Sequence, residues 1–306
     1  MATAHAREVL VIGGSRYFGK RLIRRLVESG DRVTVLNRGS SAPPPGVAHL
    51  VADRDDEAAL AEAIGARRFD VVVDQVCYTP RQAEIARRVL AGRTGRYVMT
   101  STVEVYEHED SAAPVPESAV EPAAVAVDLE LPWHDTDFLD AHYGEGKRQA
   151  EAVFTAAGPD LPFVPVRVAH VLGGNDDFTG RIAHYVDRIR AGASIAVPPH
   201  PRPATYIHVE EIAGFLHWAA GARFTGPVNA ASHGTLDARE LATAVAAALP
   251  EGKTVFEVTG SAEGAPFAFR RGYAMDNSRA TRLGFTFGDV RQWLPRAVAE
   301  TLGKDD

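Results

Sequence analysis

The chain has 306 residues, a formal net charge of −7 and a single cysteine, Cys77. The negative charge argues against diffuse binding to nucleic acid or to an anionic membrane surface. One cysteine excludes an internal disulfide and a thiolate metal cluster, and no cluster of His, Asp or Glu has the spacing of metal ligands. No apolar run approaches the roughly 18 residues of a membrane span. We therefore expect a cytoplasmic protein with no metal, no membrane partner and no nucleic-acid partner.

Up to residue 100, short apolar runs alternate with amphipathic stretches. The runs have no polar–apolar alternation, which is typical of strands buried on both faces of a parallel sheet. We predict strands at 9–12, 33–36, 49–52, 70–74 and 96–100, and helices at 20–29, 56–64 and 81–91. Alternating strands and helices predict an α/β fold with a doubly wound sheet and right-handed crossovers.

Residues 107–140 interrupt this alternation, because they hold four prolines, many acidic residues and no clear period. We predict a long acidic loop with short helices, which is either a binding segment or a solvated insertion. Beyond it the alternation resumes. We predict helices at 143–157, 181–191, 210–220, 237–249 and 290–302, and strands at 163–168, 206–209 and 255–258.

Three glycines connect the first predicted strand to the first predicted helix, in the pattern GGxxxxG. A glycine turn lets the backbone approach a pyrophosphate, and the helix N-terminus supplies free N–H groups and partial positive charge. We therefore expect this loop to bind the phosphates of a dinucleotide; the alternative is a turn that only packs helix on strand. The residues of the loop are Gly13, Gly14, Ser15, Arg16, Tyr17, Phe18 and Gly19.

The end of the second predicted strand bears on which nicotinamide cofactor is bound. A site for NAD usually places Asp or Glu there to bind the ribose 2′-hydroxyl. This chain has Asn37 and Arg38 instead, and Arg16 in the glycine loop adds a second positive charge nearby. An arginine can bind a 2′-phosphate through charge-assisted hydrogen bonds. We therefore predict NADP rather than NAD; the alternative is that Arg38 is a solvated turn residue.

Tyr143 and Lys147 stand four residues apart, so they share one face of a predicted helix. A phenol with a pKa of about 10 is a poor base at neutral pH, and a neighbouring ammonium lowers that pKa. Such a pair can exchange a proton with an alcohol or ketone. Thr100, Ser101 and Thr102 close a buried strand at the edge where α/β sheets bind ligands. A hydroxyl there either binds the same substrate oxygen or caps the strand.

Together, the glycine pattern, the Ser/Thr-rich strand end before Tyr106 and the Tyr143/Lys147 pair resemble the extended short-chain dehydrogenase/reductases. This group is also called the NAD(P)-dependent epimerase/dehydratase family. Three later segments, which begin at Arg167, Tyr206 and Met275, resemble further family motifs in the family's order. The resemblance implies a Rossmann domain with a smaller discontinuous substrate lobe. The expected Rossmann domain is 1–168 with 204–221 returning to it, and the expected lobe is 169–203 with 222–306.

The resemblance also implies roles for individual residues. Thr102 positions the substrate oxygen, Tyr143 is the acid/base, and Lys147 activates Tyr143 and contacts the cofactor ribose. Asp53 matches a position after the third strand that contacts the adenine. Hydride then passes between the nicotinamide and a secondary alcohol or ketone carbon. We also expect a homodimer.

One departure from the family concerns the segment from Ser101 to Tyr106, which is similar to the S-T-D-E-V-Y of nucleotide-sugar 4,6-dehydratases. In those enzymes the Asp protonates the leaving hydroxyl and the Glu removes the neighbouring carbon proton. Here Val103 stands at the Asp position, while Glu104 is retained. The change argues against dehydration and leaves Glu104 as either a second acid/base or a structural carboxylate.

A second departure concerns the expected substrate site. Sugar-nucleotide members of the family place an Asn at His170 and a pyrophosphate-binding Arg at Ala204. We expect His170 to contact the substrate, unless it is a packed core residue. Arg202 and Arg270 are the candidate anchors for a substrate phosphate, so a sugar nucleotide is only one of the substrates to consider.

The residues therefore predict an NADP-dependent oxidoreductase-type enzyme that acts on a small polyhydroxylated molecule. The Tyr, Lys and Thr residues do not distinguish epimerisation, dehydration and reduction. The alternative is a non-catalytic dinucleotide-sensing or RNA-binding relative. Gly14–Gly19 together with Asn37-Arg38-Gly39 also resembles a subgroup that includes plastid RNA-binding proteins, although those often lack the Tyr/Lys pair that this chain keeps.

Overall fold

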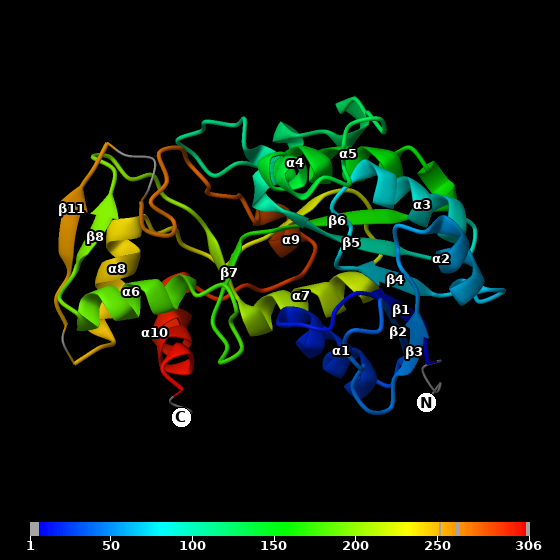
Figure 1. The fold of residues 1–306 in the computed structure, drawn as a ribbon, viewed down its shortest axis with the longest axis horizontal. Helices are drawn as coiled ribbons and strands as arrows, with labels where there is room; N and C mark the ends of the chain where they lie inside the picture. The colour runs from blue at the N-terminus through cyan, green and yellow to red at the C-terminus, as the bar shows by residue number, and fades with distance from the viewer. Residues whose placement is uncertain (1–5, 251, 261–263, 304–306) are drawn as a thin grey trace. The chain divides into compact units, whose positions relative to one another are not determined.

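The computed structural model describes residues 6–250, 252–260 and 264–303. Its largest sheet has seven strands in the order β10-β6-β5-β4-β1-β2-β3 (Figure 1). The strands are β1 Glu8–Ile12, β2 Arg32–Asn37, β3 Ala48–Val51, β4 Val71–Asp74, β5 Tyr97–Thr102, β6 Phe163–Val168 and β10 Val228–Ala230. β1 pairs in parallel with both β2 and β4, and the β2–β3 and β4–β5 pairs are parallel as well. The strand order reverses beside β1, so the predicted doubly wound sheet is confirmed.

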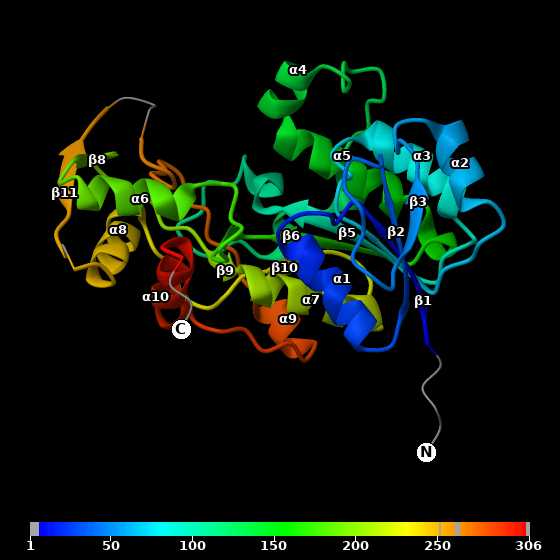
Figure 2. The same ribbon diagram turned by 60° about the horizontal axis from the view of Figure 1, so that its bottom comes forward.

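Helices cover both faces of this sheet, as Figures 1 and 2 show. One face carries α1 Phe18–Glu28 and α7 Val209–Gly221, and the other carries α2 Glu57–Ile64, α3 Pro80–Leu90 and α5 Tyr143–Thr155. The central strands are consequently apolar on both sides: Val9, Leu10, Val11 and Ile12 are at most 1% exposed. None of the described helices combines the length and the apolar character needed to cross a membrane.

The start of α3 fixes the loop that follows β4. Thr79 caps the helix by accepting a hydrogen bond from the Gln82 backbone N–H at 3.2 Å, and Pro80 occupies the first turn, where a missing N–H does no harm. The Gln82 side chain reaches back and accepts the Tyr78 N–H at 2.7 Å. The loop between β4 and α3 is therefore held by the helix that it introduces.

The acidic segment 107–140 contains short helices, as its composition predicts. They are the 3₁₀ turns Glu117–Ala119 and Pro122–Ala124 and the helix α4 Thr136–Ala141. Asp135 caps α4 by accepting the Phe138 N–H at 2.8 Å. The segment is thus folded, but its elements are too short for a periodic sequence signal.

Two compact units share the chain. The first comprises the described residues of Met1–Val105, Val120–Arg167 and Ala213–Val228, and the second those of Tyr106–Ala119, Val168–Ile212 and Asn229–Asp306. This division differs from the expected one mainly at 106–119 and 204–212, which belong to the second unit, and at 222–228, which belongs to the first. Sequence motifs mark where a segment begins, but only packing decides which core it joins.

The second unit has its own core and two small parallel sheets. β7 His170–Leu172 pairs with β9 Tyr206–His208, and β8 Ser194–Val197 pairs with β11 Val255–Val258. Its helices are α6 Arg181–Arg190, α8 Ala238–Ala247, α9 Ser278–Arg282 and α10 Val290–Thr301. Buried residues from these elements form one apolar cluster around Tyr185, Leu241 and Leu294. The sequence did not predict β7, β8, β10 or α9, because three to five residues carry no reliable period.

Candidate functional site

The glycine loop makes a tight turn between β1 and α1. Gly13 and Gly14 have φ angles of 81° and 77°, which favour glycine. A Cβ at Gly13 would lie 2.7 Å from Val76 Cγ1, and a Cβ at Gly19 would lie 2.6 Å from the Cα of Gly14. The glycines therefore let the loop, the helix start and the segment after β4 approach one another closely.

The start of α1 has the features of an anion-binding helix N-terminus. Tyr17 occupies the N-cap position with φ 51°, and its side chain makes no capping hydrogen bond. The first turn of the helix contains no acidic residue. The partial positive charge of this helix end is therefore left uncompensated by side chains, as a bound phosphate requires.

Asn37, the last residue of β2, organises the neighbouring loop. Its Nδ2 donates to Ser15 Oγ in the glycine loop and to the Ser41 carbonyl, each at 3.0 Å. Its Oδ1 accepts the Gly39 N–H at 2.7 Å and lies 3.0 Å from His49 Nε2. The amide is thus fully occupied, so it is not free to bind a ribose in the manner of an aspartate.

Arg16 and Arg38 directly follow the hydrogen-bonded residues Ser15 and Asn37 in the chain. Both side chains are exposed, and neither forms a hydrogen bond or ion pair with another described residue. Asp53, after β3, is also exposed, and its carboxylate accepts the Asp55 N–H at 3.0 Å. Arg16, Arg38 and Asp53, which the sequence predicts as cofactor contacts, therefore face solvent.

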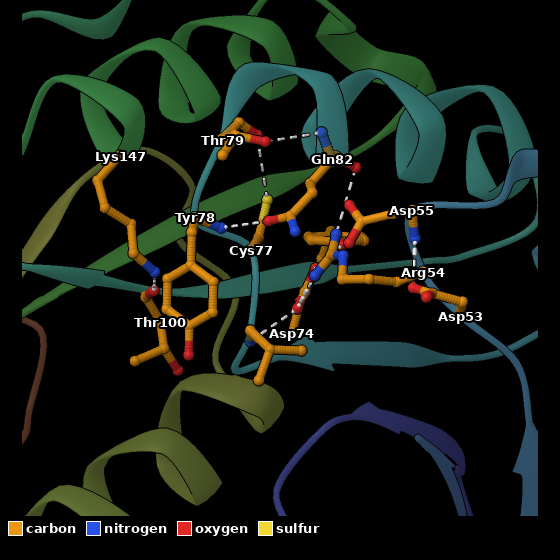
Figure 3. Close-up of polar contacts among 12 residues, drawn as sticks. Asp53, Arg54, Asp55, Asp74, Cys77, Tyr78, Thr79, Gln82, Thr100 and Lys147 are labelled. Carbon is orange, nitrogen blue, oxygen red and sulfur yellow. Dashed lines mark hydrogen bonds and ion pairs between the residues drawn. The ribbon is translucent and has the colours of Figure 1, made fainter. Parts of the chain in front are cut away.

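A buried charge network that the sequence did not reveal lies at the end of β4. Arg54 donates two hydrogen bonds to Asp74, at 2.7 and 2.8 Å, and both residues are buried (Figure 3). Tyr97 adds a hydrogen bond to the same carboxylate at 2.6 Å. The only sequence signal was a charged residue ending the apolar run of β4.

Cys77 lies three residues beyond the end of β4 and is fully buried. Burial raises the pKa of its thiol to about 12. A thiol in this state is a small apolar group rather than a nucleophile. The single cysteine therefore has a packing role.

Tyr143 and Lys147 both lie on the first turns of α5, as predicted. Lys147 is 1% exposed, and its Nζ donates to the Thr100 carbonyl at 2.7 Å (Figure 3). Burial lowers the pKa of this ammonium to about 8, against the opposing influence of Cys77 and Asp74. The Lys147 Nζ lies 5.8 Å from the centre of the half-buried Tyr143 ring. The lysine thus places positive charge beside the phenol, at the end of β5.

The hydroxyls that close β5 have different surroundings. Thr102 Oγ1 accepts the Glu104 N–H at 3.2 Å, so the hydroxyl hydrogen of Thr102 remains available to donate. Thr100 Oγ1 is buried with no partner among the described residues. Ser101 Oγ donates to Glu151 at 2.5 Å. Glu104 lies two residues after Thr102 and is half-buried.

A buried ion pair supports this region from behind. Glu151, one turn beyond Lys147 on α5, pairs with Arg167 on β6 at 2.7 Å, and neither side chain is exposed. Arg167 begins a sequence motif that the family shares, and the structure gives it this anchoring role. The pair joins the helix that carries Tyr143 to the sheet.

The segment after β4 connects the two halves of the candidate site within the first unit. Its Gln75 and Val76 contact Gly19 and Gly13 of the glycine loop. Its Tyr78 places its ring centre 4.6 Å from Lys147 Nζ. Sequence reasoning missed Tyr78, because an aromatic residue before a helix cap carries no functional signal.

The second unit holds the three residues expected to bind substrate. His170 on β7 is buried, its Nε2 has no partner among the described residues, and burial lowers its pKa to about 3. Its ring stacks on Phe269 with centres 5.1 Å apart. Arg202 is half-buried with an unpartnered buried Nε, and the exposed Arg270 donates to the Gly260 carbonyl at 2.6 Å.

Similarity to proteins of known structure is extensive but remote. The fold is similar to the enzyme WbmH of Bordetella bronchiseptica in complex with NAD+, with a TM-score of 0.71 and 19% identity over 98% of this chain and 100% of that chain. It is also similar to UDP-glucose 4-epimerase of Thermotoga maritima with UDP-glucose, with a TM-score of 0.73 and 17% identity over 97% and 99%. At identities this low, the structural similarity shows a shared fold and nothing more.

Two further similarities bear on the family. The chain is 25% identical over 215 residues to the chloroplast stem-loop binding protein of 41 kDa b from Arabidopsis thaliana. The match covers 65% of this chain and 50% of that protein, so the chain spans about half the length of this curated relative. Residues 9–231 match the model of the NAD dependent epimerase/dehydratase family. Because that match covers more than half of the chain, the protein belongs to the NAD dependent epimerase/dehydratase family.

Proposed function

We propose that the protein is an NADP-dependent oxidoreductase-type enzyme acting at a secondary alcohol or ketone of a small polyhydroxylated substrate. The observation that carries the proposal is the placement of Lys147. This buried ammonium lies between the Thr100 carbonyl, at 2.7 Å, and the Tyr143 ring, in the unit that also holds the glycine loop. Burying an ammonium with a single hydrogen bond among the described residues costs free energy, and the same ammonium lowers the pKa of a neighbouring phenol.

The residues of the first unit fit a dinucleotide. Gly13 and Gly14 make the tight positive-φ turn that directs the loop into α1, and α1 begins without a side-chain cap. Gly13, Gly14 and the backbone of Ser15 to Gly19 would hold the pyrophosphate. Asp53 at the end of β3 would contact the adenine, and Lys147 would contact the nicotinamide ribose. The bound nicotinamide would supply a carbon that takes up and returns hydride.

The protein's own residues would move the proton. In the oxidation direction, Tyr143 would accept the hydroxyl proton while the substrate carbon loses hydride, and the nearby Lys147 charge favours the phenolate. Thr102 has a hydroxyl hydrogen that is free to donate to the same substrate oxygen. Glu104 follows in the chain and would exchange a proton at the neighbouring carbon if the reaction includes elimination.

The choice of NADP rests on the end of β2. The Asn37 amide is occupied by four polar contacts, with Gly39 and Ser41 of the following loop, Ser15 of the glycine loop and His49 of β3, and no carboxylate stands in its place. Ser15 and Asn37 are hydrogen-bonded to each other, and the residue that follows each of them in the chain, Arg16 and Arg38, is an exposed cation. Such a pair of guanidinium groups suits a 2′-phosphate.

Within the second unit, His170, Arg202 and Arg270 are the candidate substrate contacts. His170 is neutral at physiological pH because burial lowers its pKa to about 3, so it would act as a hydrogen-bonding group rather than a cation. The relatives of known structure include an enzyme bound to UDP-glucose. A sugar, free or linked to a nucleotide, is therefore the first class to test.

The test begins with the purified protein and its bound small molecules. Denaturing the protein should release NADP(H), which mass spectrometry would identify. Fluorescence titration should give tighter binding of NADPH than of NADH. Turnover should then be sought with sugars and sugar nucleotides. Tyr143→Phe should bind the cofactor as the wild type does but lose at least a hundredfold in rate, because a positioned acid/base supplies about 10²–10⁴. Full activity in Tyr143→Phe would exclude the proposed role.

A second candidate function is RNA binding without turnover, which the similarity to the chloroplast stem-loop binding protein favours. The net charge of −7 and the retained Tyr143/Lys147 pair argue against it. Gel-shift titration with a stem-loop RNA at two salt concentrations separates the two. Micromolar or tighter, salt-sensitive RNA binding together with no nicotinamide binding would favour the second candidate.

A further inference from the structure

Three groups enclose the Lys147 ammonium. The Thr100 carbonyl accepts one hydrogen bond at 2.7 Å, and the Tyr78 ring centre lies 4.6 Å away (Figure 3). The Tyr143 ring centre lies 5.8 Å away. An ammonium carries three N–H groups, and the Thr100 carbonyl is its one hydrogen-bond acceptor among the described residues. The nearest remaining electron-rich surface is therefore the face of Tyr78.

Tyr78 is fixed at this place by its backbone. Its N–H donates to the Gln82 side chain at 2.7 Å. Its carbonyl faces α5 at Gly146, where an added Cβ would lie 2.5 Å from that oxygen. The glycine lets the helix that carries Lys147 pack directly against the residue whose ring covers the ammonium. The two ring centres of Tyr78 and Tyr143 lie 6.2 Å apart, so Tyr78 borders the phenol as well.

The surroundings of Lys147 do not otherwise balance its burial. Burial lowers its pKa most, and Arg54 lowers it further, while Cys77, Asp74 and Glu151 raise it. Asp74 is already paired with Arg54 by two hydrogen bonds, and Glu151 is paired with Arg167. A cation that is removed from water beside an aromatic face gains stability from the ring quadrupole. That gain acts on the charged form alone.

We propose that Tyr78 is a positioning residue for the Tyr143/Lys147 pair, and that its ring holds the buried Lys147 in its charged form against the Thr100 carbonyl. The proposal rests on the function proposed above for that pair. Tyr78 acts through its aromatic face, so its hydroxyl is dispensable. Tyr143 remains the residue that exchanges a proton with the substrate, and Tyr78 transfers none.

The chain offers a direct test, because it has only four lysines, at positions 20, 147, 253 and 304. Protein labelled with ¹³C at lysine Cε gives four titrating NMR signals, and the signal that disappears in Lys147→Arg is that of Lys147. The wild-type signal should titrate with a pKa of about 8. In Tyr78→Phe, which keeps the ring, Lys147 should titrate within about 0.3 pH unit of its wild-type pKa, because the aromatic face is unchanged.

Tyr78→Leu keeps an apolar cover but removes the quadrupole, so the Lys147 pKa should fall by about one pH unit, equivalent to about 1.4 kcal/mol. The sign is diagnostic, because water that enters a loosened site would raise the pKa instead. An unchanged or raised pKa in Tyr78→Leu overturns the proposal. So does a Tyr78→Phe shift as large as that of Tyr78→Leu. If the Leu variant does not fold, Tyr78→Met fills more of the space and is titrated in its place.

Cofactor titration separates this inference from the proposed function. NADPH fluorescence should show several-fold weaker binding to Tyr78→Leu than to Tyr78→Phe, because a neutral or displaced Lys147 contacts ribose less well. Equal affinities in the two variants would contradict the positioning role. Failure of the wild type to bind any nicotinamide dinucleotide would overturn the proposed function, and the lysine titration would still decide what Tyr78 does to Lys147.

Discussion

The two sides of the candidate site handle charge in opposite ways. On the β1–β2 side, Arg16 and Arg38 are exposed and have no partner among the described residues. On the β4–β5 side, Arg54, Asp74 and Lys147 are buried. Arg54 is hydrogen-bonded to Asp74, and Lys147 is hydrogen-bonded to the Thr100 carbonyl. The exposed side leaves its positive charges to the solvent, while the Arg54–Asp74 pair on the buried side is neutralised within the protein.

The difference indicates which side contributes to the stability of the fold and which is available for ligand binding. Exposed cations are solvated, so they contribute little to folding and remain available for binding. Buried charges are favourable only with good partners, and losing one partner leaves the other charge in a poorly solvated place. Substitutions on the first side should therefore change affinity, and those on the second side should change stability.

The largest effect is expected from Arg54→Met. Asp74 would keep its charge at 0% exposure with only Tyr97 and the Val76 N–H as donors. We expect a loss of about 3–5 kcal/mol in the free energy of unfolding, measured by urea titration. Arg38→Met, the same change on the exposed side, should stay within about 0.5 kcal/mol of the wild type. Similar losses in the two variants would contradict the comparison.

Gly146→Ala should come next, with a loss of about 1–3 kcal/mol, because its Cβ would meet the Tyr78 carbonyl at 2.5 Å. Gly214, within α7, is the matched control, because nothing lies within 4 Å of its added Cβ. Gly214→Ala should stabilise the protein by about 0.5–1 kcal/mol through helix propensity. Thermal unfolding of the two variants should therefore shift in opposite directions; a shared sign would show that the close approach of α5 to Tyr78 is not required.

The second unit extends the comparison to a buried base, His170, whose Nε2 has no hydrogen-bond partner among the described residues. The unfolded His170 should titrate near its usual pKa of about 6.5, while the folded residue stays neutral down to about 3. Between these values the unfolded state binds one more proton, so stability falls as pH falls. At pH 5 this lowers the free energy of unfolding by about 2 kcal/mol relative to pH 7. His170→Asn should lose that part of the pH dependence; an unchanged slope would mean that His170 is not buried and neutral.

The smallest change in free energy is expected from Arg38→Ala on the exposed side. It should weaken NADPH binding about tenfold, equivalent to about 1.4 kcal/mol, and leave NADH binding unchanged. Arg16→Ala should have the same sign. Isothermal titration at two salt concentrations checks both, since exposed charge contacts weaken with salt. Equal losses for both cofactors would place Arg38 outside the 2′-phosphate site.

Sequence reasoning located the parts of the site that local chemistry dictates. The glycine spacing, the Tyr143/Lys147 spacing and the hydroxyls of Thr100 to Thr102 all lie where predicted, on the loop, helix and strand end expected of them. It missed Tyr78 and the Arg54–Asp74 pair. Those residues become neighbours through the order of strands in the sheet, and neither spacing nor periodicity records that order.

By itself, the sequence determined the doubly wound fold and the cofactor-type loop, because buried strands, helix periods and glycine turns are set by neighbouring residues. Only the tertiary structure decided that Lys147 is fully buried against Thr100, that Tyr78 covers it, and that 106–119 joins the second unit. The physical reason is that burial and charge pairing depend on contacts between segments distant in the chain. Desolvation then changes what the same side chains do, which is why a lysine found by its spacing has a pKa that only the packed structure assigns.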